Sequence, residues 1–152
     1  MRTGRQRGVT LLEMLVVVAI IGAIVGISVP ALTSGLAGVR LSAASGSVAS
    51  FLTSSMNRVE RREQAAAIVI DPRENVLRTF TAASGEKPDN TLTMPSGVFI
   101  EGGEARRFLL YPGGTFPRME VVLRNEKGAR RSVSIDPITV VPRIRRVEGA
   151  AR

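Results

Sequence analysis

The chain has 152 residues, a formal net charge of +8, and neither cysteine nor histidine. Its length suits one domain with an additional segment better than two full domains. The missing residue types exclude disulfide bonds, Cys or His metal sites, and catalysis by Cys or His. Aromatic residues make up only 4% of the chain, so we expect a small core of Val, Ile, Leu and Phe. We therefore expect a protein that is not an enzyme and that uses no metal and no cofactor.

The first predicted element is an apolar helix that follows a basic N-terminus. No charged residue occurs between Glu13 and Arg40. The apolar stretch is about 20 residues long, and as a helix it would span roughly 30 Å, the thickness of a bilayer core. Arginines at positions 2, 5 and 7 precede it. The positive-inside rule then places the N-terminus in the cytoplasm and everything after residue 30 outside.

Glu13 lies within this apolar stretch, where an acidic side chain costs about 3 kcal/mol at the membrane centre and less near a helix end. A cleaved secretory signal or a plain membrane anchor would explain the apolar run. Neither explains Glu13, because Leu would serve both better. A buried core helix does not fit the length of the uncharged run. An intramembrane carboxylate implies a partner, which would come from another chain or from the amine that cleavage after Gly8 would create on Val9.

The sequence RGVTLLE at residues 7–13, at the start of an apolar span, resembles the cleavage and methylation motif of type IV prepilins. The resemblance implies that prepilin peptidase cuts after Gly8. The same enzyme would methylate the new N-terminal residue, Val9, where the family usually has Phe. Glu13 would pair with the amine of a neighbouring subunit during filament assembly.

Pro30 follows the apolar run, at a place where pilins commonly carry a proline that kinks the helix. By this resemblance, residues 1–8 are a leader peptide and residues 9–37 are the transmembrane and assembly half of a long N-terminal helix. In the membrane this half would anchor a monomer. In a filament the same apolar surface would pack between subunits.

From residue 39 to about residue 63, apolar residues recur every three or four positions, which predicts an amphipathic helix with one buried stripe. The stripe consists of Leu41, Ala44, Val48, Phe51, Leu52, Met56 and Val59. We expect this segment to continue the apolar helix, so that one helix runs for about 50 residues. The stripe then needs a sheet to cover it.

Short strands are predicted after the helix. They cover residues 67–70, 76–81, 98–100, 108–111, 119–123 and 131–135, with a last short strand at 140–141. Residues 84–90 are predicted to be a disordered loop. This order of elements indicates the α+β class: a pilin-like head of antiparallel sheet, residues 38–146, packed on the long helix. A flexible basic tail, residues 147–152, would follow.

The C-terminal half also resembles the GspH/FimT-type minor pilins. A strand, a Pro-Gly turn at residues 112–114 and a hairpin are followed by a turn at residues 136–139 that begins with Asp and ends with Thr. The family often has Gly after that Thr, whereas this chain has Val140. The resemblance implies a structural minor pseudopilin of a type II secretion system, near the tip of a periplasmic filament. It would be a single-pass inner-membrane protein with a periplasmic head, and its partners would be prepilin peptidase and other pseudopilins or pilins.

Arg143, Arg145 and Arg146 form a basic cluster near the C-terminus. One interpretation is a solvated tail. In the alternative interpretation the protein is a FimT-type minor pilin of a type IV pilus that binds DNA during uptake, because PRIR at residues 142–145 is similar to a C-terminal Gly-Arg-x-Arg motif of such pilins, without the Gly. Arginines at a mobile end can neutralise phosphates. No aromatic residue accompanies them, so base stacking is not expected.

Overall fold

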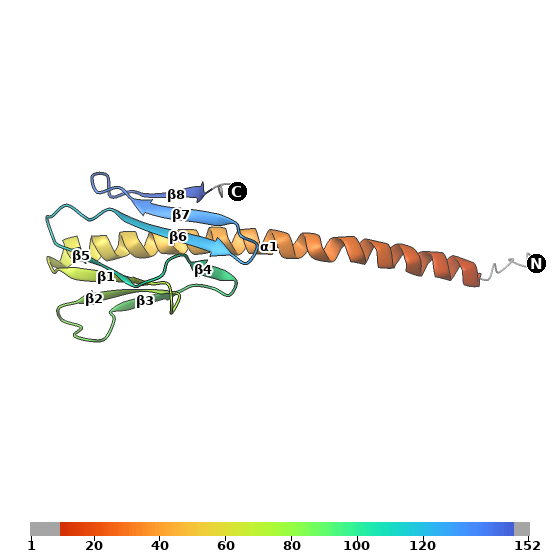
Figure 1. The fold of residues 1–152 in the computed structure, drawn as a ribbon, viewed down its shortest axis with the longest axis horizontal. Helices are drawn as coiled ribbons and strands as arrows, with labels where there is room; N and C mark the ends of the chain where they lie inside the picture. Colours follow the sequence, from red (N-terminus) through yellow and green to blue (C-terminus); the bar gives the residue numbers. More distant parts are fainter. Residues whose placement is uncertain (1–9, 148–152) are drawn as a thin grey trace, which may run out of the picture. The chain divides into compact units, whose positions relative to one another are not determined.

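The computed structural model describes residues 10–147, except for the side chains of residues 27–34. In this part of the chain one helix, α1 (Leu11–Arg62), precedes the strands (Figure 1). The strands are β1 (Ala66–Asp71), β2 (Val76–Thr81), β3 (Asn90–Thr93), β4 (Val98–Ile100), β5 (Arg106–Leu110), β6 (Met119–Asn125), β7 (Arg130–Ile135) and β8 (Pro142–Val147). With its 52 residues, α1 confirms the prediction of one long helix before a set of short strands.

The chain divides into two compact units, Met1–Leu36 and Ala37–Arg152. Helix α1 belongs to both units. We call its residues 11–36 the apolar segment and its residues 37–62 the head helix.

In the apolar segment, every described side chain up to residue 26 is exposed. An α-helix completes a turn in 3.6 residues, so this run exposes apolar side chains all around the helix. The large ones are Leu11, Leu12, Met14, Leu15, Val16, Val17, Val18, Ile20, Ile21, Ile24 and Val25. Among the described residues, no helix meets the length and hydropathy required to cross a membrane.

The head helix buries the stripe that its sequence predicts. All seven residues of the stripe are at most 6% exposed. Ser47 and Ser50, on the opposite face, are exposed. Ser55 is buried beside the stripe, and its hydroxyl lies 2.9 Å from the hydroxyl of Thr79 on β2. The amphipathic pattern therefore correctly identifies the residues that pack against the rest of the head.

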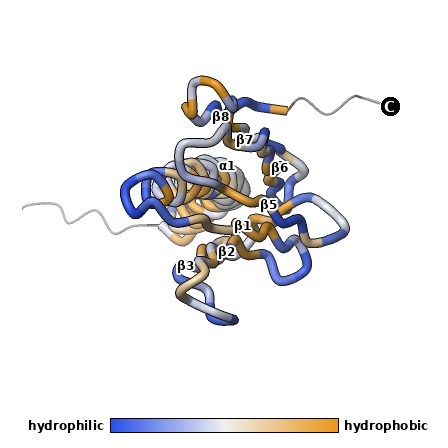
Figure 2. Tube along the Cα trace, turned by 90° about the vertical axis from the view of Figure 1, so that its left-hand side faces the viewer, coloured by the Kyte–Doolittle hydropathy of each residue, from blue (hydrophilic) through white to orange (hydrophobic). Residues whose placement is uncertain are grey.

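Two antiparallel sheets of four strands each cover the stripe, where the sequence predicts one sheet. Sheet A has the order β3-β2-β1-β5 and sheet B the order β4-β6-β7-β8. Figure 2 shows strands of sheet B on one side of α1 and strands of sheet A on another. Buried side chains of the helix and of both sheets form one hydrophobic cluster. The prediction of a single sheet needs correction. β4 lies between β3 and β5 in the sequence, and these two strands belong to sheet A, but β4 pairs with β6 of sheet B.

Asn75, in the turn between β1 and β2, ties β4 to this turn of sheet A. Its amide nitrogen donates to the carbonyl oxygen of Val98 at 2.8 Å, and its amide oxygen accepts the N–H of Ile100 at 2.8 Å. The φ of Asn75 is 60°, a left-handed conformation that Asn adopts more readily than most residues. This one side chain therefore provides two hydrogen bonds to a strand of sheet B.

Two further strand predictions need correction. β3 begins at Asn90, where the sequence predicts only the end of a disordered loop. The strand predicted at residues 140–141 is wrong. Val140 has a φ of 55° and ends a turn, and the last strand is β8. Residues 142–146 are therefore part of an ordered sheet, and Val147 ends β8, so it does not begin a tail. The remaining residues of the predicted tail, 148–152, lie outside the described residues.

Candidate functional site

Thr10 caps the start of α1. Its hydroxyl oxygen accepts the backbone N–H of Glu13 at 3.2 Å, and its carbonyl oxygen accepts the N–H of Met14 at 3.2 Å. Ser, Thr, Asp and Asn are the residues preferred at this position, because their side chains satisfy a backbone N–H that the first turn leaves unpaired. This role of Thr10 was not predicted, although the spacing T-x-x-E at residues 10–13 is the signature of a capping box.

The exposed carboxylate of Glu13 forms no hydrogen bond or ion pair with another described residue. A carboxylate in the first turn interacts favourably with the partial positive charge of the helix N-terminus, which explains its tolerance there. Thr10 already satisfies the backbone N–H of Glu13. Within the described part of the chain, the charged oxygens of Glu13 thus remain available to a group outside this chain.

The other predicted residues of the N-terminal motif fall outside this description. Gly8 and Val9 lie before the described residues, and the side chain of Pro30 lies in the gap at residues 27–34. The backbone around Pro30 is assigned to α1. Cleavage, methylation and the helix kink therefore stay predictions.

The arginine cluster lies on β8, an edge strand of sheet B. Arg143 lies opposite Ser134, Arg145 opposite Ser132, and Ile144 opposite the buried Val133. Successive side chains of a strand point to opposite faces of the sheet. Arg143 and Arg145 therefore lie on the outer face, whereas Ile144 and Arg146 lie on the face that contains the core. The sheet thus separates Arg146 from the other two predicted arginines.

Other residues far apart in the sequence share that outer face. Arg130 on β7 lies opposite Arg124 on β6, which lies opposite Phe99 on β4. Arg130 forms an ion pair with Glu101, and the guanidinium carbon of Arg124 lies 5.3 Å from the ring centre of Phe99. Phe99 belongs to this face at its far edge from β8, so it does not accompany Arg143 and Arg145. Only the strand pairing reveals these neighbours.

Two aspartates of the head accept backbone hydrogen bonds from their own turns. The carboxylate of Asp136 accepts the backbone N–H of Ile138 at 2.9 Å and that of Thr139 at 3.4 Å. These two hydrogen bonds, the one from Ile138 foremost, lower the pKa of Asp136 below its ordinary value. Asp71 accepts two backbone N–H groups of its own turn in the same way. No three acidic side chains of the described residues come together to hold a metal ion.

Residues 3–29 match the family model of the prokaryotic N-terminal methylation motif. The match supports a type IV pilin-like protein. This motif is the substrate signal of prepilin peptidase, which implies assembly partners of the pilin class, and pilin-like proteins are generally structural and not enzymatic. The α+β fold, with its N-terminal helix packed on antiparallel sheet, is consistent with such a protein. Searches of the curated proteins and of the solved structures gave no match.

Proposed function

We propose that this pilin-like chain is a structural minor pseudopilin of a type II secretion system. It assembles near the tip of a periplasmic filament and joins the tip subunits to the shaft. The observation that carries the proposal is the run of apolar side chains at residues 11–26, which is exposed on all sides of the helix and lies within the match to the methylation motif. A helix that is apolar all around needs a membrane or other helices as its cover.

In the proposed function the apolar segment is covered first by the membrane and later by other helices. Before assembly, the apolar segment anchors the protein in the inner membrane with the head in the periplasm. Prepilin peptidase cuts after Gly8 and methylates Val9. In the filament, the same side chains pack against helices of neighbouring pseudopilins or pilins, and Glu13 meets the N-terminal amine of a neighbour. An unpaired charge in such an apolar bundle is costly, so this ion pair selects one register of packing.

Replacing Glu13 by Leu tests the assembly step. Insertion and cleavage should continue, because Leu is favourable in the bilayer and the cleavage site is unchanged. Co-purification with other pilin-like subunits should fall at least about tenfold, since removing one partner of a buried ion pair costs several kcal/mol. Met14→Leu, next in sequence and without a charge change, is the control and should co-purify normally. Undiminished co-purification of Glu13→Leu would show that apolar packing alone sets the place of this subunit.

Processing has a test of its own. Mass spectrometry of the native protein should show a chain that starts at Val9 with an N-methyl group. Gly8→Val should leave the precursor in the inner membrane, because a branched side chain does not fit a site selective for Gly. A native chain that starts at Leu32 would instead identify an ordinary signal peptide.

A FimT-type minor pilin that binds DNA is the second candidate function. It is supported by the outer face of sheet B, which carries Arg143 and Arg145 on β8 and, two strands away across β7, Arg124 on β6. Such a face can bind several phosphates, and removing one arginine that pairs with a phosphate should reduce the salt slope of binding by about 1. Alanine at Arg143 or Arg145 should weaken the binding of a short DNA duplex by the detergent-solubilised protein. Alanine at Arg146, on the opposite face, is the matched control. Absence of binding at low salt would reject this candidate.

A further inference from the structure

The outer face of sheet A carries a notch between two large apolar side chains. Ala67, on the central strand β1, lies opposite Phe80 on β2 and opposite Leu109 on β5. Residues opposite each other on paired strands share a face of the sheet. Ala67 is only 4% exposed, so its methyl group forms the floor of a narrow hollow between these two larger neighbours. Tyr111, just beyond β5, continues this apolar surface and is 59% exposed.

Ala67 and its two opposite neighbours form one row of side chains across the sheet. The next row on the same face has an apolar residue in the centre and a cationic residue on each side. Val69, two residues after Ala67, lies opposite Arg78 on β2 and Arg107 on β5. Arg78 already forms an ion pair with Glu74. Arg107 has no ion pair or hydrogen bond with any residue that the structure describes. The second row therefore offers one uncommitted positive charge beside the notch.

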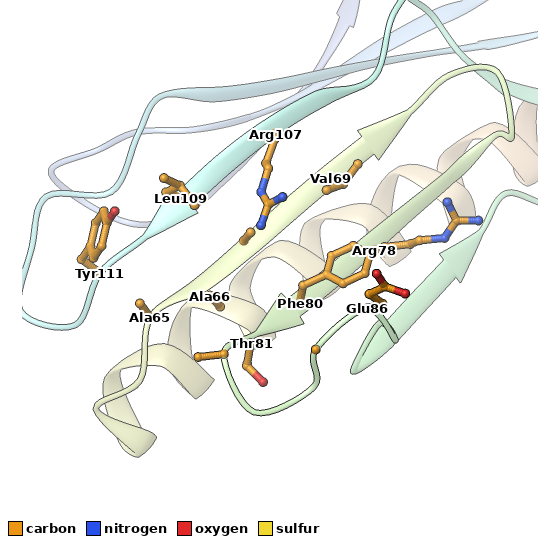
Figure 3. A pocket seen from close by; sticks show the side chains of 13 residues that line it. Ala65, Ala66, Val69, Arg78, Phe80, Thr81, Glu86, Arg107, Leu109 and Tyr111 are labelled. Carbon is orange, nitrogen blue, oxygen red and sulfur yellow. The ribbon is translucent and has the colours of Figure 1, made fainter.

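Together the two rows line an open groove of about 590 Å³ (Figure 3). Figure 3 shows Phe80 on the β2 side of β1, and Arg107 and Leu109 on the β5 side. Glu86, in the loop after β2, adds a negative charge on the Phe80 side. The groove thus has an apolar floor, a positive side along β5 and a negative group at the opposite side. A charge pattern of this kind gives a bound segment a direction as well as a place.

We propose that this groove docks an extended segment of a neighbouring pilin-like subunit that carries an apolar side chain and, two positions away, a carboxylate. The apolar side chain fills the notch over Ala67, and the carboxylate pairs with Arg107. Side chains two positions apart in an extended chain lie on the same face, roughly 7 Å apart, which matches the step from one row of the sheet to the next. This inference rests on the proposed function, because it takes the partner from the filament.

The charges of the groove favour a segment of a neighbouring subunit over a second copy of this chain or a small molecule. An unpaired guanidinium beside an apolar surface attracts a carboxylate, and pairing on desolvation gives specificity. A second copy of this chain is disfavoured, because each copy keeps a formal net charge of +5 after the three arginines before Gly8 are removed, and the two would repel each other. A small-molecule site would need several polar groups that converge on the ligand, whereas here Arg107 and Glu86 lie on opposite sides of an apolar floor.

A photo-crosslinking amino acid in the full chain, produced in cells that assemble the filament, tests the docking. p-Benzoylphenylalanine in place of Tyr111 keeps an aromatic ring at the edge of the groove. The same probe in place of Phe99, which is 38% exposed on the outer face of sheet B, is the positional control. We expect the probe at Tyr111 to capture one pilin-like subunit, through a peptide with an acidic residue two positions from an apolar one. The probe at Phe99 should not capture this peptide.

Charge reversal then tests the pairing. Arg107→Glu should lower the yield at the Tyr111 probe at least about tenfold, since close charge pairs at interfaces contribute about 1.5 kcal/mol or more. Arg118→Glu, an exposed arginine in the loop after β5, has the same charge change and should leave the yield unchanged. Lysine in place of the captured carboxylate should restore the yield to Arg107→Glu. Leu109→Ser, which makes one wall of the notch polar, should lower the yield without any change in charge.

Three results would overturn the inference. One is capture of no subunit from Tyr111 although the protein matures and co-purifies with the filament, which leaves the proposed function intact. Another is capture that Arg107→Glu does not weaken, and the third is capture of a second copy of this chain. A protein that neither matures at Val9 nor co-purifies with pilin-like subunits would overturn the proposed function and this inference together.

Discussion

The two halves of α1 differ in where their apolar side chains are buried. In the apolar segment, the side chains described at residues 11–26 form no polar face and are exposed all around the helix. In the head helix, apolar residues at helical spacing form one stripe, and the sheets of the same chain bury it. Apolar residues at helical spacing therefore indicate burial within the same chain, whereas an apolar run without periodicity needs a cover from outside the chain.

Separating the two halves should have the largest effect. A chain that starts at Ala37 should be a soluble monomer with cooperative thermal unfolding, because it keeps the whole hydrophobic cluster of the head. The full chain should need detergent or membranes, since its apolar segment has no cover of its own. Analytical ultracentrifugation and circular dichroism of both proteins would measure this. Aggregation of the shorter chain would mean that the head depends on the apolar segment.

Two leucines of α1, one in each unit, should differ in their contribution to the stability of the head. Leu52→Ala should lower the free energy of unfolding of the head by about 2–5 kcal/mol, because Leu52 is completely buried and its truncation leaves a cavity. Leu15→Ala should leave the unfolding of the head unchanged within about 0.5 kcal/mol, since Leu15 is 66% exposed. Urea titration of both variants of the full chain in detergent compares the two. Equal effects would contradict the division of α1 into two units.

Two adjacent serines test the polar contact between the head helix and sheet A. Ser55→Ala should cost about 1–3 kcal/mol, because it removes the buried partner of the Thr79 hydroxyl. Ser54→Ala is the control. Ser54 is exposed and its hydroxyl bonds only within the helix, to the carbonyl oxygen of Phe51, so its effect should stay within about 0.5 kcal/mol. If both variants unfold alike, the Ser55–Thr79 contact does not stabilise the head.

The smallest expected effect concerns the backbone conformation of Val140, in the turn before β8. Val140 has a φ of 55°, a conformation that costs a residue with a side chain about 1–2 kcal/mol. Val140→Gly should therefore be about 1 kcal/mol more stable than Val140→Ala, the reverse of the usual order of these two residues. Both variants remove the packing of the Val140 side chain on the core, so their difference isolates the backbone. Thermal unfolding of the two variants measures it, and a more stable Ala variant would exclude strain at this position.

Local sequence patterns predicted much of this molecule. The length of α1, all seven residues of its buried stripe, the pairing of β1 with β2 and the β6–β7 hairpin follow from spacing and turn residues within a short stretch of chain. The RGVTLLE motif likewise carries its meaning in consecutive residues, and the match to the methylation motif covers the same positions. Features encoded by neighbouring residues are readable without the fold, because helical and strand periods are local.

Contacts between strands that are far apart in the sequence could be seen only in the tertiary structure. Asn75 has no sequence signal for its two bonds to β4, and the pairing of β4 with β6, which divides the strands into two sheets, was not predicted. Strand pairing places Arg146 on the opposite face of sheet B from Arg143 and Arg145. It also places Arg107 beside the notch over Ala67. A strand pattern tells which side chains share a face of one strand. The identity of the neighbouring strand depends on long-range packing, which no stretch of consecutive residues encodes.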